Sequence, residues 1–221
     1  YTTWCGPCKN MAEKVFPQKA AGDYFNPRFV CVKYDMEQGE GVELAKRWEV
    51  HAYPTFLIIR PDGSIQHRMV GGGDLESFIA RTEKGLNPET NLEAQKRRYA
   101  EGNMDNRQLL SYWQTLAEAA DPDENKVYEE LIGKLSNQEK TQAAYWDIYH
   151  SEACQIGTPV WQFMLAHLPE LRANNGTEKV DNFLTSNYQD KLELYILGYY
   201  DEKTVPFETL ARDIPTLGVA Q

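Results

Sequence analysis

The chain has 221 residues, of which 42% are hydrophobic and 12% aromatic, and its formal net charge at pH 7 is −10. This composition excludes an intrinsically disordered chain, and no stretch approaches the roughly 20 apolar residues of a membrane-spanning helix. Residues up to Leu86 include 11 basic and 11 acidic side chains, whereas the remainder includes 12 and 22, so the excess negative charge lies beyond Leu86 and argues against nucleic acid as a partner.

The first predicted element is a helix that begins at the pair Cys5 and Cys8. Apolar residues follow Cys8 at the spacing of one helical face as far as Pro17, which disfavours continuation of a helix. Residues 29–35 are mainly β-branched and aromatic and predict a largely buried strand, and residues 41–48 predict a short helix. Helix and strand therefore alternate in this part of the chain.

Two apolar runs within residues 54–72 meet at a Pro-Asp-Gly turn over 61–63, a pattern that predicts a β-hairpin. An amphipathic helix is predicted over residues 75–86. A parallel strand that is reached by a crossover needs a partner earlier in the chain, so the helix-first order predicts a further strand ahead of Tyr1. The expected fold class is α/β, with this first central strand missing from the 221 residues.

The second part of the chain is helical in pattern throughout. Apolar residues recur at helical spacing, and turn-like segments at 120–123, 136–138 and 174–176 separate the predicted helices. Asn87 precedes a proline at the point where charge and pattern change, which predicts a boundary between domains 1–87 and 88–221. The second domain is expected to be all-helical and built of helical hairpins; it faintly resembles a tetratricopeptide stack, but no fixed repeat period is present.

The pair Cys5-Gly6-Pro7-Cys8 leaves three interpretations open: a redox pair, half of a zinc site, or a structural turn. At a helix start, unpaired backbone N–H groups and the helix dipole stabilise a thiolate at Cys5, and Cys8 lies on the same face within bridging distance. Zinc needs two further ligands, whereas the other cysteines and the histidines are isolated. A structural turn would leave exposed thiols unused. These arguments favour redox chemistry and predict no metal site.

Other residues with chemical potential have plainer interpretations. Pro54 begins an apolar strand, where a proline is tolerated at a first position, and a cis Tyr53–Pro54 bond would fit that geometry. Cys31 is expected in the core, and Cys154 is expected on a helix without a chemical role. His51, beside Pro54, is expected on a surface loop rather than tuning the cysteines.

Three motifs occur in a fixed order: WCGPCK at 4–9, YPT at 53–55 and VGG at 70–72. Joined by the predicted helices and strands, they resemble the thioredoxin family of thiol:disulfide oxidoreductases, and the likeness covers residues 1 to about 86. The separation of 46 positions between the second cysteine and the proline is more similar to the bacterial envelope branch of the family, including the C-terminal domains of membrane disulfide reductases. The resemblance therefore implies a periplasmic or cell-envelope location, with the cytoplasm as the alternative.

The resemblance also implies roles for individual residues. Cys5 would be the nucleophile and Cys8 the resolving thiol. The backbone before the cis proline would pair with an extended substrate, and the two glycines would let a substrate approach closely, although a loop bend also explains them. The implied substrate-binding positions are Trp4, Gly6, Pro7, Tyr53, Pro54, Gly71 and Gly72.

The predicted function is a thiol:disulfide oxidoreductase that acts as a disulfide reductant. The resemblance implies a reduction potential in the region of the thioredoxin value, about −270 mV. No metal or organic cofactor is expected, because the cysteine disulfide is itself the redox centre. The expected partners are protein thiols and disulfides, an unidentified electron donor and, for the helical domain, a protein. The alternative is a thioredoxin-fold scaffold whose helical domain is a protein-interaction module.

Overall fold

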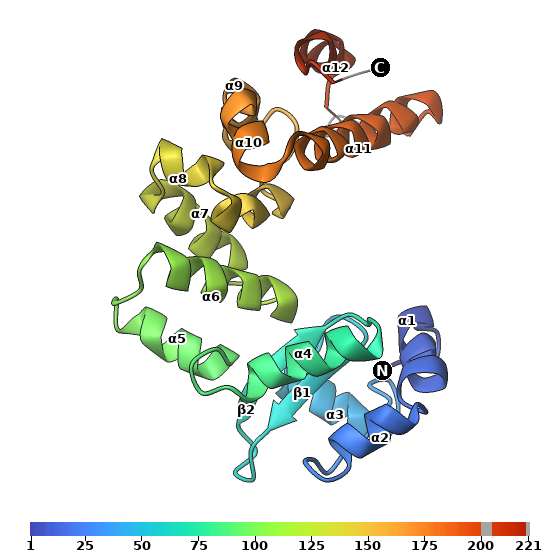
Figure 1. Ribbon diagram of the computed structural model, residues 1–221. Coiled ribbons are helices and arrows are strands. Elements are labelled where there is room, and N and C mark those ends of the chain that lie inside the picture. The colour runs from blue at the N-terminus through green and yellow to red at the C-terminus, as the bar shows by residue number, and fades with distance from the viewer. Residues whose placement is uncertain (200–204, 220–221) are drawn as a thin grey trace. The chain divides into compact units, whose positions relative to one another are not determined.

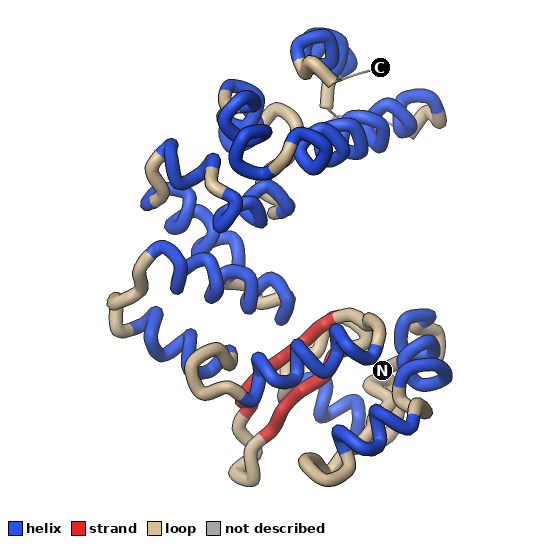
Figure 2. Tube along the Cα trace, viewed as in Figure 1, coloured by secondary structure: helices blue, strands red, loops and turns tan. Residues whose placement is uncertain are grey.

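The computed structural model describes residues 1–199 and 205–219, and the chain divides into two compact units, Tyr1–Val127 and Tyr128–Gln221. The first unit combines helices with one two-stranded sheet (Figures 1 and 2). Its elements are α1 (Gly6–Asn10), the π-helix η1 (Met11–Val15), α2 (Lys19–Phe25), α3 (Glu40–Arg47), β1 (Thr55–Ile59), β2 (Ile65–Val70), α4 (Leu75–Leu86), α5 (Leu92–Ala100) and α6 (Asn106–Ala119).

The predicted hairpin is confirmed. β1 and β2 are antiparallel, with Thr55 opposite Val70 and an irregular register near the end of β1. In the turn, Gly63 has φ +84°, and its N–H donates to the carbonyl of Arg60 at 2.9 Å. Glycine adopts this left-handed conformation without a Cβ penalty, so the turn sequence fixes the pairing of the strands.

The predicted helix over 75–86 is also confirmed, as α4. The carboxylate of Asp74 caps it by accepting a hydrogen bond from the Ser77 N–H at 2.7 Å. Phe78 on α4 packs with Met11, Val15 and Met69 in a buried cluster, and further apolar side chains surround it, namely Phe25, Phe56 and Leu75. This core joins α4 and the hairpin to the helix that follows the cysteines.

Residues 29–35 do not form the predicted buried strand. The exposed fractions of Val30 and Val32 are 93% and 70%, and Cys31 is exposed rather than in the core. Within the described residues, this segment is hydrogen-bonded to Tyr1: the ammonium group of Tyr1 donates to the carbonyl of Tyr34 at 3.1 Å. A β-strand is stabilised by a neighbouring strand, and no described strand provides one here.

An apolar cavity of about 460 Å³ lies between this segment and β1, and its lining includes Phe25, Phe56 and Phe78. β1 pairs with β2 at one edge, and within the described residues no strand pairs with its other edge. The strand expected ahead of Tyr1 stays a prediction.

The change of pattern at Asn87 marks the start of the helical region but not the limit of the compact unit. α5 and α6 pack on β2, so the first unit extends to Val127. The contacts include a hydrogen bond from the Leu92 N–H to Nδ1 of His67 at 3.1 Å and an ion pair between Arg60 and Glu93. Helices beyond residue 87 thus take part in the packing of the hairpin. The division into domains 1–87 and 88–221 stays a prediction.

Every regular element described in the second unit is a helix, as the pattern predicts. α7 (Glu124–Lys134) leads into this unit. Thr158 is the N-cap of α9 and Pro159 is its first residue, as the sequence predicts. No helix of the described residues is long and apolar enough to cross a membrane. The remaining elements are α8 (Asn137–Thr141), the 3₁₀ helix η2 (Ala143–His150), α9 (Pro159–Ala166), α10 (Leu168–Asn175), α11 (Thr177–Ile196), α12 (Phe207–Asp213) and the 3₁₀ helix η3 (Ile214–Thr216).

The pattern predicts Cys154 on a helix, and this prediction is wrong. Cys154 lies in the loop between η2 and α9. Its side chain is buried, with an exposed fraction of 4%, and burial raises the pKa of the thiol to about 12. A neutral buried thiol is a poor nucleophile.

Candidate active site

The cysteine pair stands at the start of α1. Cys5 is the N-cap, Cys8 lies in the first turn, and the two form a disulfide. The backbone N–H of Cys8 donates a hydrogen bond to Sγ of Cys5 at 3.1 Å. Pro7 fits this first turn because an N–H at this position has no partner within the helix. Both cysteines are buried, at 3% and 6% exposed, while Gly6 and Pro7 face solvent.

The helix that carries the cysteines is anchored in the core. α1 continues directly into η1, as the predicted helix does, and the N–H of Phe16 donates to the carbonyl of Met11 at 2.9 Å. Met11 and Val15 are buried in the cluster with Phe78. This packing fixes the direction of the helix, so the Cys8 N–H at its N-terminus stays directed at the Cys5 sulfur.

The loop before β1 supplies the second part of the site. The Tyr53–Pro54 bond is cis, the geometry that the position of Pro54 favours. Thr55 Oγ1 donates to the carbonyl of Ala52 at 2.7 Å and closes the turn around this bond. The ring of Tyr53 meets the ring of Trp4 edge to face, with centroids 5.9 Å apart. The proline loop therefore adjoins the residue that precedes Cys5.

The glycine segment after β2 supplies the third part. Gly71 has φ +86°, and its N–H donates to the carbonyl of Pro54 at 2.9 Å. At Gly72, an added Cβ would lie 3.4 Å from the Met11 side chain and 3.8 Å from the carbonyl oxygen of Pro7. We refer to Gly71 and Gly72 as the glycine wall, since they connect the proline loop with the cysteine helix.

The structure thus brings the three sequence motifs to one place. Trp4 contacts Tyr53, the glycine wall contacts Pro54 and Pro7, and Cys8 and Pro54 line the same apolar cavity. Trp4 is 66% exposed and so forms an aromatic surface beside the disulfide. Together these residues surround a buried disulfide with a rim of backbone and aromatic groups.

Glu37 is a site residue that the sequence analysis missed. The indole N–H of Trp4 donates to both carboxylate oxygens of Glu37, at 3.0 and 3.1 Å, and the Glu37 N–H donates to Asp35 at 3.0 Å. The bond fixes the orientation of the Trp4 ring and places a negative charge at the rim. No local pattern distinguishes Glu37 from other surface acids, because its partner lies 33 positions away.

Arg81 was missed as well. Its guanidinium lies between α4 and the glycine wall, and it donates to the carbonyls of Val70 and Gly71 at 2.8 and 3.2 Å. In sequence, Arg81 is an ordinary charged residue of an amphipathic helix. Only the position of α4 against the end of β2 makes these two carbonyls reachable.

The histidines do not join the cysteines. His51 is exposed on the proline loop, as expected. His67 is fully buried under α4 and α5, where burial lowers its pKa to about 4. No group of three or more His, Cys, Asp or Glu side chains that could hold a metal occurs in the residues the structure describes. The described residues thus provide no cluster that would supply the cysteine pair with further zinc ligands.

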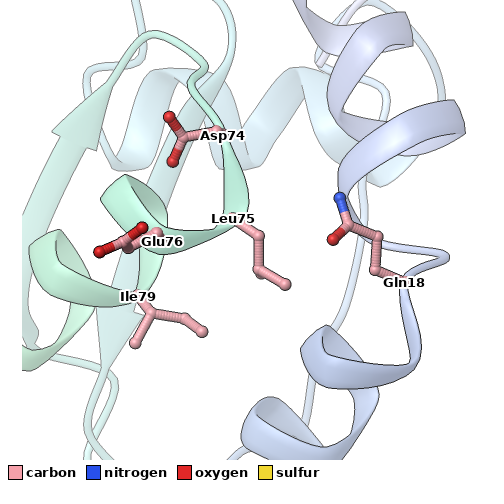
Figure 3. Close-up of a pocket in the computed structure, with 5 residues that line it drawn as sticks. All are labelled: Gln18, Asp74, Leu75, Glu76 and Ile79. Atoms are coloured by element: carbon pink, nitrogen blue, oxygen red, sulfur yellow. The ribbon is translucent and has the colours of Figure 1, made fainter.

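A further hollow of about 520 Å³ lies between Gln18 and the start of α4 (Figure 3). Two of its polar side chains have structural partners: Asp74 caps α4, and the Gln18 amide donates to the carbonyl of Lys14 at 2.9 Å. None of the predicted site residues lines this hollow. We assign no ligand to it.

Comparison with known proteins places the likeness in the first part of the chain. The family model described as Thioredoxin matches residues 1–84. Thioredoxin Asp f 28 of Aspergillus fumigatus is 33% identical over 81 residues, which are 36% of this chain and 69% of that protein. Thioredoxin-1 of Drosophila melanogaster is 38% identical over 60 residues, which are 27% of this chain and 51% of that protein.

Two further relatives carry the name disulfide-isomerase. A protein disulfide-isomerase of Datisca glomerata is 28% identical over 88 residues, which are 40% of this chain and 17% of that protein. A candidate disulphide-isomerase of Bacteroides thetaiotaomicron with a solution structure is 47% identical, with a TM-score of 0.37, over 39% of this chain and 72% of that chain. The chain thus spans from 17% to 72% of the length of these relatives.

Proposed function

This chain belongs to the thioredoxin family, and we propose that it is a protein-disulfide oxidoreductase that reduces disulfides through Cys5 and Cys8. One observation carries the proposal: the Cys5–Cys8 disulfide lies at a helix N-terminus, where Cys8 lines one cavity with Pro54 and the glycine wall adjoins Pro7. This arrangement combines a stabilised thiolate with a surface on which a peptide can lie.

The proposed reaction moves two electrons from the reduced cysteine pair to a substrate. The Cys5 thiolate attacks one sulfur of the substrate disulfide, forms a mixed disulfide and releases the other substrate sulfur as a thiolate. The Cys8 thiolate then attacks the Cys5 sulfur, which frees the remaining substrate thiolate and closes the Cys5–Cys8 disulfide. An external dithiol reductant must reopen that disulfide before the next turnover.

The rim of the site supports the roles proposed for its other residues. The backbone at Tyr53, ahead of Pro54, would pair with an extended substrate segment, and the exposed Trp4 ring would contact its side chains. Gly6 and Pro7 cover the cysteines on the solvent side, so a substrate would lie against them. These positions favour an extended peptide over a compact small molecule.

The test is turnover of a protein disulfide such as insulin, with dithiothreitol as electron donor. We expect Cys5→Ser to abolish turnover. Prereduced Cys8→Ser, mixed with the substrate after dithiothreitol is removed, should accumulate a mixed disulfide. Cys31→Ser is the matched control and should retain the parental rate, because Cys31 is a free, exposed thiol outside the Cys5–Cys8 disulfide. Turnover that survives Cys5→Ser would refute the proposal.

The direction of electron flow rests on the Gly-Pro pair between the cysteines. We propose that the Cys5–Cys8 pair has a reduction potential close to that of thioredoxin, about −270 mV. Titration in glutathione and dithiothreitol redox buffers measures this potential. A value close to that of the oxidant DsbA, about −120 mV, would instead indicate that the chain oxidises thiols. A chain without any reversible couple would favour the alternative, a scaffold whose helices bind a protein partner.

We also propose a bacterial envelope location, on the similarity of motif spacing alone. Fractionation of the native cells, followed by detection with an antibody, tests it. Recovery in the cytoplasmic fraction would overturn this part of the proposal without affecting the cysteine chemistry.

A further inference from the structure

Arg81 links the glycine wall to a helix that lies beyond the family match. On one side, its guanidinium donates to the carbonyls of Val70 and Gly71, at 2.8 and 3.2 Å. On the other side, its Nε donates to Oε1 of Glu118 on α6. The family model ends at residue 84, so α6 is an addition to the matched region.

Glu118 is well placed to hold the guanidinium. Its side chain is 16% exposed and that of Arg81 18%, and its second oxygen accepts from Lys84 Nζ at 3.3 Å. Charge-assisted hydrogen bonds of low exposure are stronger than neutral ones and are less screened by salt. Because the guanidinium is planar and rigid, a carboxylate on Nε orients both Nη groups. Here those groups point at the carbonyl of Gly71 in the wall and at that of Val70, the residue before it.

The wall in turn contacts both halves of the redox site. The Gly71 N–H donates to the carbonyl of Pro54 at 2.9 Å, and Gly72 lies against Met11 and Pro7. A chain of contacts therefore runs from Glu118 through Arg81 and the wall to the proline loop. Glycine residues have no side chains that could pack and hold the wall in place. Hydrogen bonds from Arg81 to the backbone of this segment supply that restraint.

We propose that Glu118 is a positioning residue that, through Arg81, holds the glycine wall in the conformation that binds a protein substrate. The proposal rests on the proposed function, because the wall matters only if a substrate disulfide is bound there. It assigns a task to α6: this helix sets the shape of the substrate groove without touching the substrate.

The test compares three variants of the full 221-residue chain in the insulin assay. Glu118→Ala removes the partner of Arg81 and should raise KM about fivefold, the equivalent of about 1 kcal/mol for one hydrogen bond, with kcat within about twofold of the parent. Glu118→Gln keeps an acceptor for Nε and should give an intermediate KM. Glu93→Ala is the matched control, since it removes an ion pair of α5 with Arg60, on the opposite end of β1 from the wall.

A second measurement does not depend on turnover. The Gly71 amide should exchange its hydrogen about fivefold faster in Glu118→Ala than in the parent or in Glu93→Ala, because its bond to Pro54 is less well held. Parental exchange and parental KM in Glu118→Ala would overturn the proposal. If the parent itself shows no turnover, the proposed function fails, and the exchange rates still decide whether Glu118 holds the wall.

Should Glu118→Ala fail to fold, Arg81→Lys serves in its place. A lysine keeps the charge beside Glu118 but has no planar fork to reach two carbonyls at once. The same increases in KM and in Gly71 exchange are expected, and parental values would again overturn the proposal.

Discussion

The backbone N–H of Cys8 donates to the sulfur of Cys5 at 3.1 Å, within the first turn of a helix anchored by Met11 and Val15. In the reduced protein the same N–H faces a sulfur that can ionise. A hydrogen bond and the positive end of the helix both stabilise the thiolate form relative to the thiol.

The first prediction is therefore that the pKa of the Cys5 thiol in a Cys8→Ser chain lies below that of a free cysteine, which is about 8.5. Thiolate absorbance or the pH dependence of alkylation measures it. Cys31→Ser is added to the same chain so that the exposed second thiol does not contribute. A pKa at or above that of free cysteine would show that the helix end does not activate the sulfur.

Sequence patterns predicted the elements whose determinants are local. The hairpin depends on a Pro-Asp-Gly turn between two apolar runs, and α4 on a capping Asp74 followed by an apolar face. The cysteine helix is likewise defined by the residues from Gly6 to Val15. In each case the information lies within a few positions of the residue that uses it.

The residues that sequence analysis missed are held by long-range contacts. Trp4 and Glu37 are 33 positions apart, and Arg81 and Glu118 are 37 apart, so neither pair leaves a local signal. The error at residues 29–35 has the converse cause. Their β-branched pattern is that of a buried strand, but burial requires a partner strand, which the local pattern does not reveal.

The second prediction concerns the pH dependence of stability. His67 is fully buried, accepts a hydrogen bond at Nδ1 from the Leu92 N–H, and has its pKa lowered from 6.5 to about 4 by burial. Lys84 and Arg81 also lower this pKa, whereas Glu118 raises it. The unfolded chain takes up a proton near pH 6.5 and the folded chain only near pH 4, so the free energy of unfolding should fall by about 3 kcal/mol between these values.

Urea unfolding at a series of pH values from 7 to 4.5 measures this fall. His67→Gln removes the titrating group and should flatten the profile, while His51→Gln, a change in an exposed histidine, should leave it as in the parent. The carboxylates that titrate in the same interval are common to all three chains. Parallel profiles for the parent and His67→Gln would show that His67 is not responsible.

The third prediction concerns packing around the same histidine. A Cβ at Gly85 would lie 2.4 Å from Cδ2 of His67 and 2.8 Å from the side chain of Ile58, so Gly85→Ala should destabilise the fold by about 1–3 kcal/mol. Gly133 on α7 has no atom within 4 Å of its added Cβ. Gly133→Ala should therefore stabilise by about 0.5–1 kcal/mol through helix propensity.

Chemical unfolding followed by circular dichroism compares the two glycine variants. The opposite signs make the comparison informative, because the substitution is the same and both sites are helical. A neutral or stabilising Gly85→Ala would mean that α4 and β2 can separate to accommodate a methyl group.

The fourth prediction tests the exposure of residues 29–35. In the oxidised chain, Cys5 and Cys8 are protected as a disulfide, Cys31 is exposed, and Cys154 is buried with a pKa raised to about 12. A thiol reagent at neutral pH should therefore modify one cysteine in the native chain and two in denaturant, as counted by mass spectrometry. Cys31→Ser should reduce the native count to zero and the denatured count to one.

This experiment also addresses the strand predicted ahead of Tyr1. In a longer chain that carries such a strand, pairing would cover Cys31, so its native modification should slow by more than tenfold, while Cys154 stays unmodified in both chains. The comparison separates burial by a neighbouring strand from any intrinsic lack of reactivity, because the thiol is the same in the two chains. Equal rates would place the added segment elsewhere and leave the open edge of β1 unpaired.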